Sequence, residues 1–82
     1  MILQEFDAIM DRMNLALDAA KNLGQPTEEA KILYQMNEAL PENLQMALED
    51  FDDESMAKQI VSRYKSQIKS KISEYREQLT LN

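Results

Sequence analysis

The stretch that decides the fold is AKQIVSRYKSQIKSKISEYREQ, residues 57–78, in which a unit of eleven residues occurs twice. Tyr64, for example, returns as Tyr75 in the second unit. Eleven residues in three turns correspond to about 3.67 residues per turn, close to the natural period of an α-helix. An apolar stripe therefore stays on one face of a single long helix, which we predict over residues 54–79. The stripe consists of Ala57, Val61, Tyr64, Ile68, Ile72, Tyr75 and Leu79.

Two shorter apolar patterns precede this helix. Apolar residues spaced three or four apart predict a first helix over residues 2–23, and Gly24 ends it because glycine adopts the left-handed conformation at little cost. Thr27 is the expected cap of the next helix, since its hydroxyl can accept hydrogen bonds from free backbone N–H groups. Pro41 then interrupts the pattern, because proline lacks an N–H and disfavours helical geometry in the preceding residue. We therefore expect residues 27–51 to form two short helices or one sharply kinked helix.

These elements predict one all-α domain over residues 1–82, a small antiparallel helical bundle of two long helices and a middle element broken at Pro41. Depending on how the broken element is counted, the bundle has three to four helices. At about 1.5 Å per residue the last helix is the longest, so its final turns extend past the others. Ile72, Tyr75 and Leu79 would then be exposed unless a second chain covers them. Since so short a chain also buries only part of its surface, we expect a homodimer.

The composition excludes several classes of function. The chain has no cysteine and no histidine, which removes Cys–His and Ser–His catalysis, zinc binding and disulfides. Its single glycine leaves no phosphate-cradling loop, and no apolar run approaches the roughly 20 residues that span a membrane. We therefore predict a protein that is not an enzyme, has no cofactor or metal and does not enter a membrane. The first residues lack the basic segment of a signal peptide, so we expect a cytoplasmic location.

The acidic stretch LEDFDDES, residues 48–55, contains five carboxylates and allows three interpretations. As a calcium loop it fails, because the glycine at the turn and the final glutamate are both missing. As a helix start it fits well, since Asp52 or Asp53 can cap a helix that begins near residue 54. As a binding surface, its remaining carboxylates would contact a basic partner. The candidate partner-binding residues of this stretch are Glu49, Asp50, Asp52 and Asp53.

Charge is unevenly distributed along the chain. Residues 1–54 carry three basic and thirteen acidic residues, net −10, whereas residues 55–82 carry six basic and two acidic residues, net +4. A basic stripe at helical spacing consists of Lys58, Lys65, Lys69 and Arg76. It is either a nucleic-acid-binding face or a solvated face whose charge the acidic residues balance. We favour the second interpretation, because the overall charge of −6 repels phosphates.

The exclusions above leave a non-catalytic role, and the sequence also has apolar helix faces and an uneven distribution of charge. It therefore predicts a small acidic protein-binding module. It would be an adaptor, inhibitor or assembly chaperone of a bacterial or phage type that docks through a helix face. Tyr34 lies off the apolar stripe of its helix and is an expected exposed anchor, and Tyr75 and Leu79 complete the candidate set. The alternatives are nucleic-acid binding through the last helix and a purely structural homo-oligomer.

Overall fold

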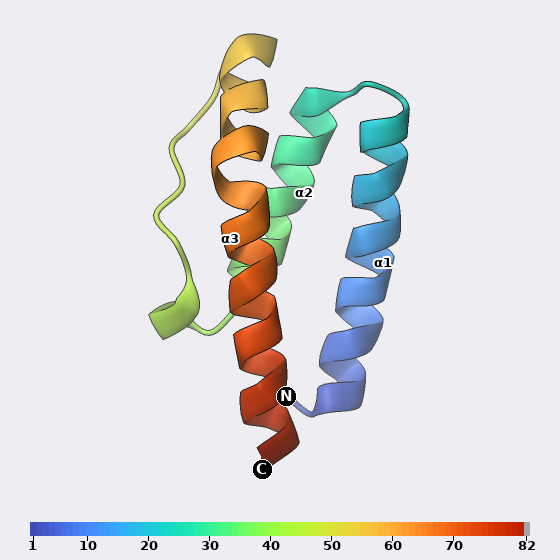
Figure 1. The fold of residues 1–82 in the computed structure, drawn as a ribbon, viewed down its shortest axis with the longest axis vertical. Helices are drawn as coiled ribbons and strands as arrows, with labels where there is room; N and C mark the ends of the chain where they lie inside the picture. The colour runs from blue at the N-terminus through green and yellow to red at the C-terminus, as the bar shows by residue number, and fades with distance from the viewer. Residues whose placement is uncertain (82) are drawn as a thin grey trace.

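The computed structural model describes residues 1–81, which fold into a bundle of three long helices with one short 3-10 turn (Figure 1). The elements are α1 (Leu3–Asn22), α2 (Pro26–Glu38), η1 (Glu42–Leu44) and α3 (Glu54–Leu81). The prediction of a small all-α bundle whose middle element is interrupted at Pro41 is confirmed. The long last helix expected from the eleven-residue repeat is confirmed as well, and α3 extends two residues past its expected end at residue 79.

The path of the chain differs from a simple up-and-down bundle. We predicted a second short helix between Pro41 and Phe51, and this prediction is wrong. After η1, residues 45–53 form no helix and return along the outside of the bundle to the start of α3 (Figure 1). We call this segment the strap. Because the strap carries the chain back, α2 and α3 run in the same direction, while α1 is antiparallel to both (Figure 1).

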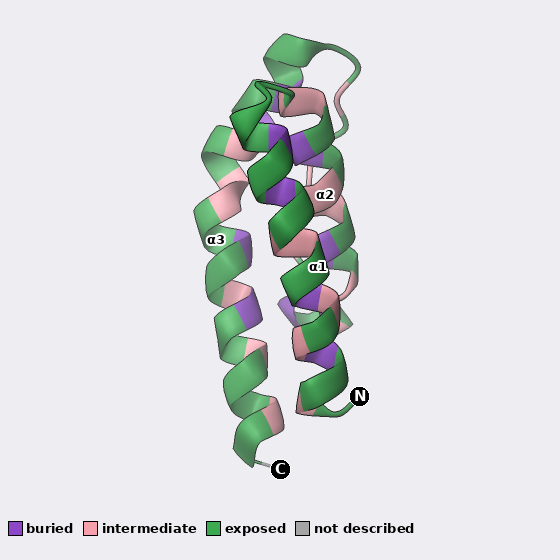
Figure 2. Ribbon diagram, turned by 90° about the vertical axis from the view of Figure 1, so that its right-hand side faces the viewer, coloured by how far each residue is buried: buried purple, intermediate pink, exposed green. Residues whose placement is uncertain are grey.

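The core lies between the three helices. Figure 2 shows the buried residues on their inward faces and an exposed outer face on α1. The largest fully buried side chains are Phe6, Leu17, Leu33, Met36 and Ile68. At about 25 cal/mol per Å² of apolar surface, each such side chain contributes roughly 1.5–3 kcal/mol to folding before the cost of ordering it. These five side chains come from all three long helices, so each helix contributes to the same core.

The last turn of α3 extends past α1 (Figure 1), but the three apolar residues that we expected to be exposed there are covered. Ile72 is only 8% exposed, and Tyr75 and Leu79 are half-buried against the main core. The first turns of α1 cover them, and the rings of Phe6 and Tyr75 meet edge to face with centroids 4.9 Å apart. The prediction that these residues are exposed is wrong, because the N-terminal end of α1 lies beside the C-terminal end of α3. A second chain is therefore not needed to cover them.

The turn between α1 and α2 follows the prediction in one residue and departs from it in another. Gly24 ends α1 with a φ of 66°, as expected for a glycine in the left-handed region. Thr27 is not the cap of α2, because the helix already begins at Pro26 and Gln25 occupies the cap position without a side-chain hydrogen bond. Proline suits this first helical position, since its φ is preset and its missing N–H would have no helical partner there.

Candidate protein-binding surface

The strap is held to α2 by the side chain of Asn37, which is only 6% exposed. Its Nδ2 donates a hydrogen bond to the carbonyl oxygen of Met46 at 2.9 Å, and the Met46 N–H donates to its Oδ1, also at 2.9 Å. One amide thus satisfies both backbone groups of Met46, as a neighbouring strand would. We did not predict this role for Asn37 from the sequence. The sequence feature that could have indicated this role is an amide residue on the apolar face of the second helix, one turn after Leu33 and one turn before Leu40.

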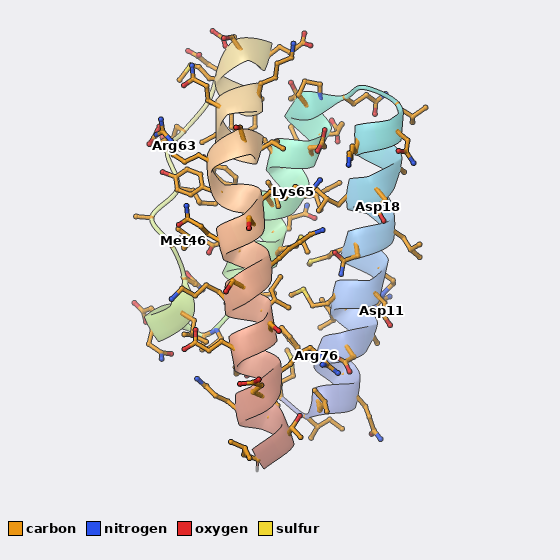
Figure 3. The ribbon with its side chains drawn as sticks, viewed as in Figure 1. Asp11, Asp18, Met46, Arg63, Lys65 and Arg76 are labelled. Atoms are coloured by element: carbon orange, nitrogen blue, oxygen red, sulfur yellow. The ribbon has the colours of Figure 1, made fainter. Side chains whose placement is uncertain are left out.

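Glu49 ties the strap to α3. Its Oε1 accepts hydrogen bonds from Nη1 of Arg63 at 2.6 Å and from the Tyr64 hydroxyl at 3.1 Å. Arg63 points toward the strap beside α3 (Figure 3). Of the four predicted partner-binding acids, Glu49 is therefore already engaged within the chain.

Asp53 is engaged as well, because its Oδ1 accepts a hydrogen bond from the backbone N–H of Met56 at 2.8 Å. This is the helix-capping role that the sequence indicated for Asp52 or Asp53, and the prediction is confirmed for Asp53. Asp50 and Asp52 are exposed, and neither has an ion pair or a side-chain hydrogen bond within residues 1–81. The predicted acidic set therefore divides into two structural residues and two free carboxylates.

Tyr34 is not the exposed anchor that we predicted. The strap covers it, and its ring packs edge to face against Phe51 with centroids 5.7 Å apart. Its hydroxyl oxygen is buried without a hydrogen-bond partner in the described part of the chain. Burial raises the pKa of this hydroxyl, and the nearby charges of Asp50 and Glu49 act in the same direction. Tyr34 therefore supports the strap from beneath.

Tyr75 and Leu79 lie at the other end of α3, away from the acidic stretch (Figure 1). Leu79 borders a hollow of about 470 Å³ that is otherwise lined by the first four residues of the chain. Met1 and Ile2 are 60% and 56% exposed there. The predicted partner-binding residues therefore do not form one surface, because the length of α3 separates the two groups.

A candidate surface does exist where the strap enters α3. We define the apex surface as Asp50, Phe51, Asp52 and Met56. These four residues line a shallow hollow of about 130 Å³, and Met56 is 38% exposed. Phe51 and Asp52 also border a second hollow of about 390 Å³, shared with Thr27, Lys31, Asp53 and Glu54. The two free carboxylates thus flank a half-buried aromatic ring beside an exposed methionine.

Three residues of the basic stripe have an acidic partner in the same chain. Nε and Nη2 of Arg76 donate to the two carboxylate oxygens of Asp7 at 2.6 and 2.8 Å. Nζ of Lys65 lies 3.7 Å from Oε2 of Glu29. Figure 3 shows both basic side chains on the side of α3 that faces α1. Lys58 pairs with Glu54 at 3.9 Å on its own helix, whereas Lys69 has no ion pair among the described residues.

Comparison with known protein families, with curated proteins and with solved structures finds no match for this chain. Within residues 1–81, no three acidic side chains come together in a way that could hold a metal ion. None of the helices described above combines the length and apolarity needed to cross a membrane. Any inference about the role of the apex surface therefore rests on its geometry and its charge.

Proposed function

We propose that this chain is a small protein-binding module and that its apex surface binds a basic segment of another protein. The observation that carries the proposal is the pair Asp50 and Asp52, two exposed carboxylates on either side of Phe51 that have no ion pair or side-chain hydrogen bond among residues 1–81. Burial of Phe51 and Met56 would supply affinity, and the carboxylates would select for lysine or arginine.

The dimensions and composition of the apex surface suit such a partner. Lysine and arginine side chains bury their aliphatic stems against apolar groups while their charged ends remain near carboxylates. The hollow of about 130 Å³ beside Phe51 has both features, with apolar atoms from Phe51 and Met56 and carboxylates at its edge. The strongly acidic first 54 residues, net −10, would also attract a basic partner over a longer range.

The proposed role is that of a cytoplasmic adaptor, inhibitor or assembly chaperone. Such a protein acts by covering a segment of its partner and not by catalysing a reaction. Nucleic-acid binding through the basic stripe has less support, because Lys65 and Arg76 already pair with Glu29 and Asp7. A phosphate backbone would have to compete with these carboxylates for the same cations.

The test compares two double variants with the same change in charge. Asp50→Lys/Asp52→Lys reverses the apex surface, and Asp11→Lys/Asp18→Lys reverses two exposed aspartates on α1 (Figure 3). Wild type and both variants are immobilised and exposed to the same cell extract, and captured proteins are quantified by mass spectrometry. We expect a set of proteins retained by wild type and by the α1 variant and reduced about tenfold or more by the apex variant, a loss of about 1.4 kcal/mol.

Capture of the same proteins in equal amounts by wild type and the apex variant would contradict the proposal. Equal loss in both variants would contradict it too, because that result indicates a general effect of net charge. Circular dichroism of the three proteins shows whether each variant keeps the helical fold.

A further inference from the structure

The strap contains a run of backbone groups without partners. Both backbone groups of Met46 bond to Asn37. In residues 47–52, by contrast, no backbone N–H or C=O takes part in a hydrogen bond with any part of the chain that the structure describes. A run of this length spans up to about 20 Å, at roughly 3.3 Å per residue. A row of free N–H and C=O groups is what the edge strand of a β-sheet presents, and such an edge pairs readily with another strand.

Side chains hold the strap in place while its backbone stays at the surface. Met46 and Leu48 pack against the main core, and Phe51 packs against the smaller core cluster beneath it. Ala47 and Glu49 are exposed between these anchors. Figure 1 shows the strap on the outside of the bundle, with no other element beyond it. Because the anchored strap is already ordered, binding along it costs less conformational entropy than binding to a mobile loop.

The contact with Asn37 determines where the free edge begins. In an extended chain both backbone groups of one residue point to the same edge, and those of the next residue point to the opposite edge. The groups of Met46 point to α2, so those of Ala47 and Glu49 point away from it. The free edge therefore begins at Ala47 and leads along the strap to the apex surface.

We propose that the basic segment bound by the apex surface adds to the strap as a β-strand. This inference rests on the proposed function and specifies the conformation in which the partner binds. The partner's backbone exchanges hydrogen bonds with the free edge, and its basic side chains face Asp50 and Asp52. These two carboxylates are two residues apart, and alternate residues of a strand lie on one face. A segment with lysine or arginine at every second position therefore matches them, and opposite charges on paired strands attract.

A basic helix is a poorer match for this edge. The backbone groups of a helix bond within the helix, so a helical partner would leave those of residues 47–52 unpaired. An added strand uses both the free backbone groups and the two carboxylates, since main-chain hydrogen bonds supply affinity and alternate side chains supply specificity.

The test uses three peptides of equal charge. The first is the blocked heptapeptide in which four lysines alternate with three valines. The second carries an N-methyl group on every valine, and the third carries one on every lysine. An N-methyl group removes a hydrogen-bond donor and blocks one edge of a strand without removing a side chain or a charge. Because successive residues present their N–H groups to opposite edges, only one of the two methylated peptides keeps the edge that pairs with the strap.

Each peptide is titrated into the isotopically labelled protein at about 0.15 M salt and followed by nuclear magnetic resonance. We expect the unmethylated peptide and one methylated peptide to bind, and the other methylated peptide to bind at least about tenfold more weakly. Bound peptide should slow the hydrogen exchange of the Ala47 and Glu49 amides. Asp50→Asn/Asp52→Asn should weaken binding of the unmethylated peptide, whereas the matched control Asp11→Asn/Asp18→Asn should not.

Equal affinity of the two methylated peptides would overturn strand addition. If Asp50→Asn/Asp52→Asn alone still weakened both, the proposed function would stand, because charge and apolar contact would then suffice without backbone pairing. Equal weakening by the apex and α1 variants would contradict both proposals, since it indicates a general attraction between charges. Absence of binding by the unmethylated peptide up to about 1 mM would overturn strand addition as well. The capture experiment described above then decides the proposed function separately.

Discussion

The two connections between the long helices are built in different ways. Residues 23–25 join α1 to α2 through backbone hydrogen bonds, from Leu23 to Ala19 at 3.0 Å and from Gln25 to Ala20 at 2.9 Å. Residues 39–53 join α2 to α3, and side chains of these two helices hold them in place, chiefly Asn37, nine residues before Met46, and Arg63, fourteen residues after Glu49. The first connection is therefore a local structure, whereas the second depends on the helices against which it packs.

Replacing Asn37 with leucine tests this comparison with the largest expected effect. The variant Asn37→Leu removes two hydrogen bonds and leaves the N–H and carbonyl of Met46 without their partner. We expect the free energy of unfolding to fall by about 2 kcal/mol, and the Met46 amide to exchange its hydrogen faster. Urea denaturation and hydrogen exchange measure the two effects.

The control for this variant is Asn43→Leu, because Asn43 is exposed in the same connection. We expect it to change the free energy of unfolding by less than about 0.5 kcal/mol. If both variants have equal stability, the Asn37 side chain is not what holds the strap.

A smaller loss of stability is expected at the first connection, where only the backbone conformation of Gly24 matters. A Cβ added at Gly24 would meet nothing within 4 Å, so the cost of Gly24→Ala comes from its φ of 66°. We expect a loss of about 1 kcal/mol, measured by the urea midpoint at unchanged slope. Gly24→Asn should lose less, because asparagine tolerates the left-handed region better than alanine. Equal losses for the two variants would speak against a purely conformational cost.

The smallest effect concerns a contact outside both connections, the ion pair of Asp7 with Arg76. The hydrogen bond from Arg76 is the main cause that lowers the pKa of the Asp7 carboxyl below its ordinary value of 3.8. Because the pKa is lower in the folded state, the stabilisation is fully present above pH 3.8 and disappears as the pH falls through the folded pKa. The thermal midpoint of Asp7→Asn should therefore lie below that of wild type at pH 7, and the difference should narrow at lower pH.

Thermal unfolding followed between pH 7 and about pH 2 checks this prediction. Asp18→Asn provides the control, since Asp18 is exposed on the same helix and has no ion pair within residues 1–81. A difference from wild type that is constant over this pH range would show that the Asp7 carboxylate is not the source of the stabilisation.

Local sequence was sufficient wherever the decisive interactions are local. The eleven-residue repeat predicted α3 because helical period depends on neighbouring residues only. Gly24 predicted a helix end, and Asp52 or Asp53 predicted a helix start, for the same reason: a left-handed glycine and a capping carboxylate act within one turn.

The strap was decided by tertiary structure. Leu44, Ala47, Leu48 and Phe51 are spaced as on a helix face, so their pattern favours a helix that the structure does not contain. The extended form prevails because Asn37, Arg63 and Tyr64 on the two flanking helices satisfy its polar groups. These partners are brought together only by the packing of α2 against α3.

The same distinction applies to the candidate surface. The sequence alone determined that the acidic stretch begins a helix and is rich in carboxylates. Which carboxylates remain without a contact among the described residues was settled by the fold, because Arg63 and the backbone N–H of Met56 engage Glu49 and Asp53. Charge is a property of each residue, whereas availability depends on what the folded chain places within hydrogen-bonding distance.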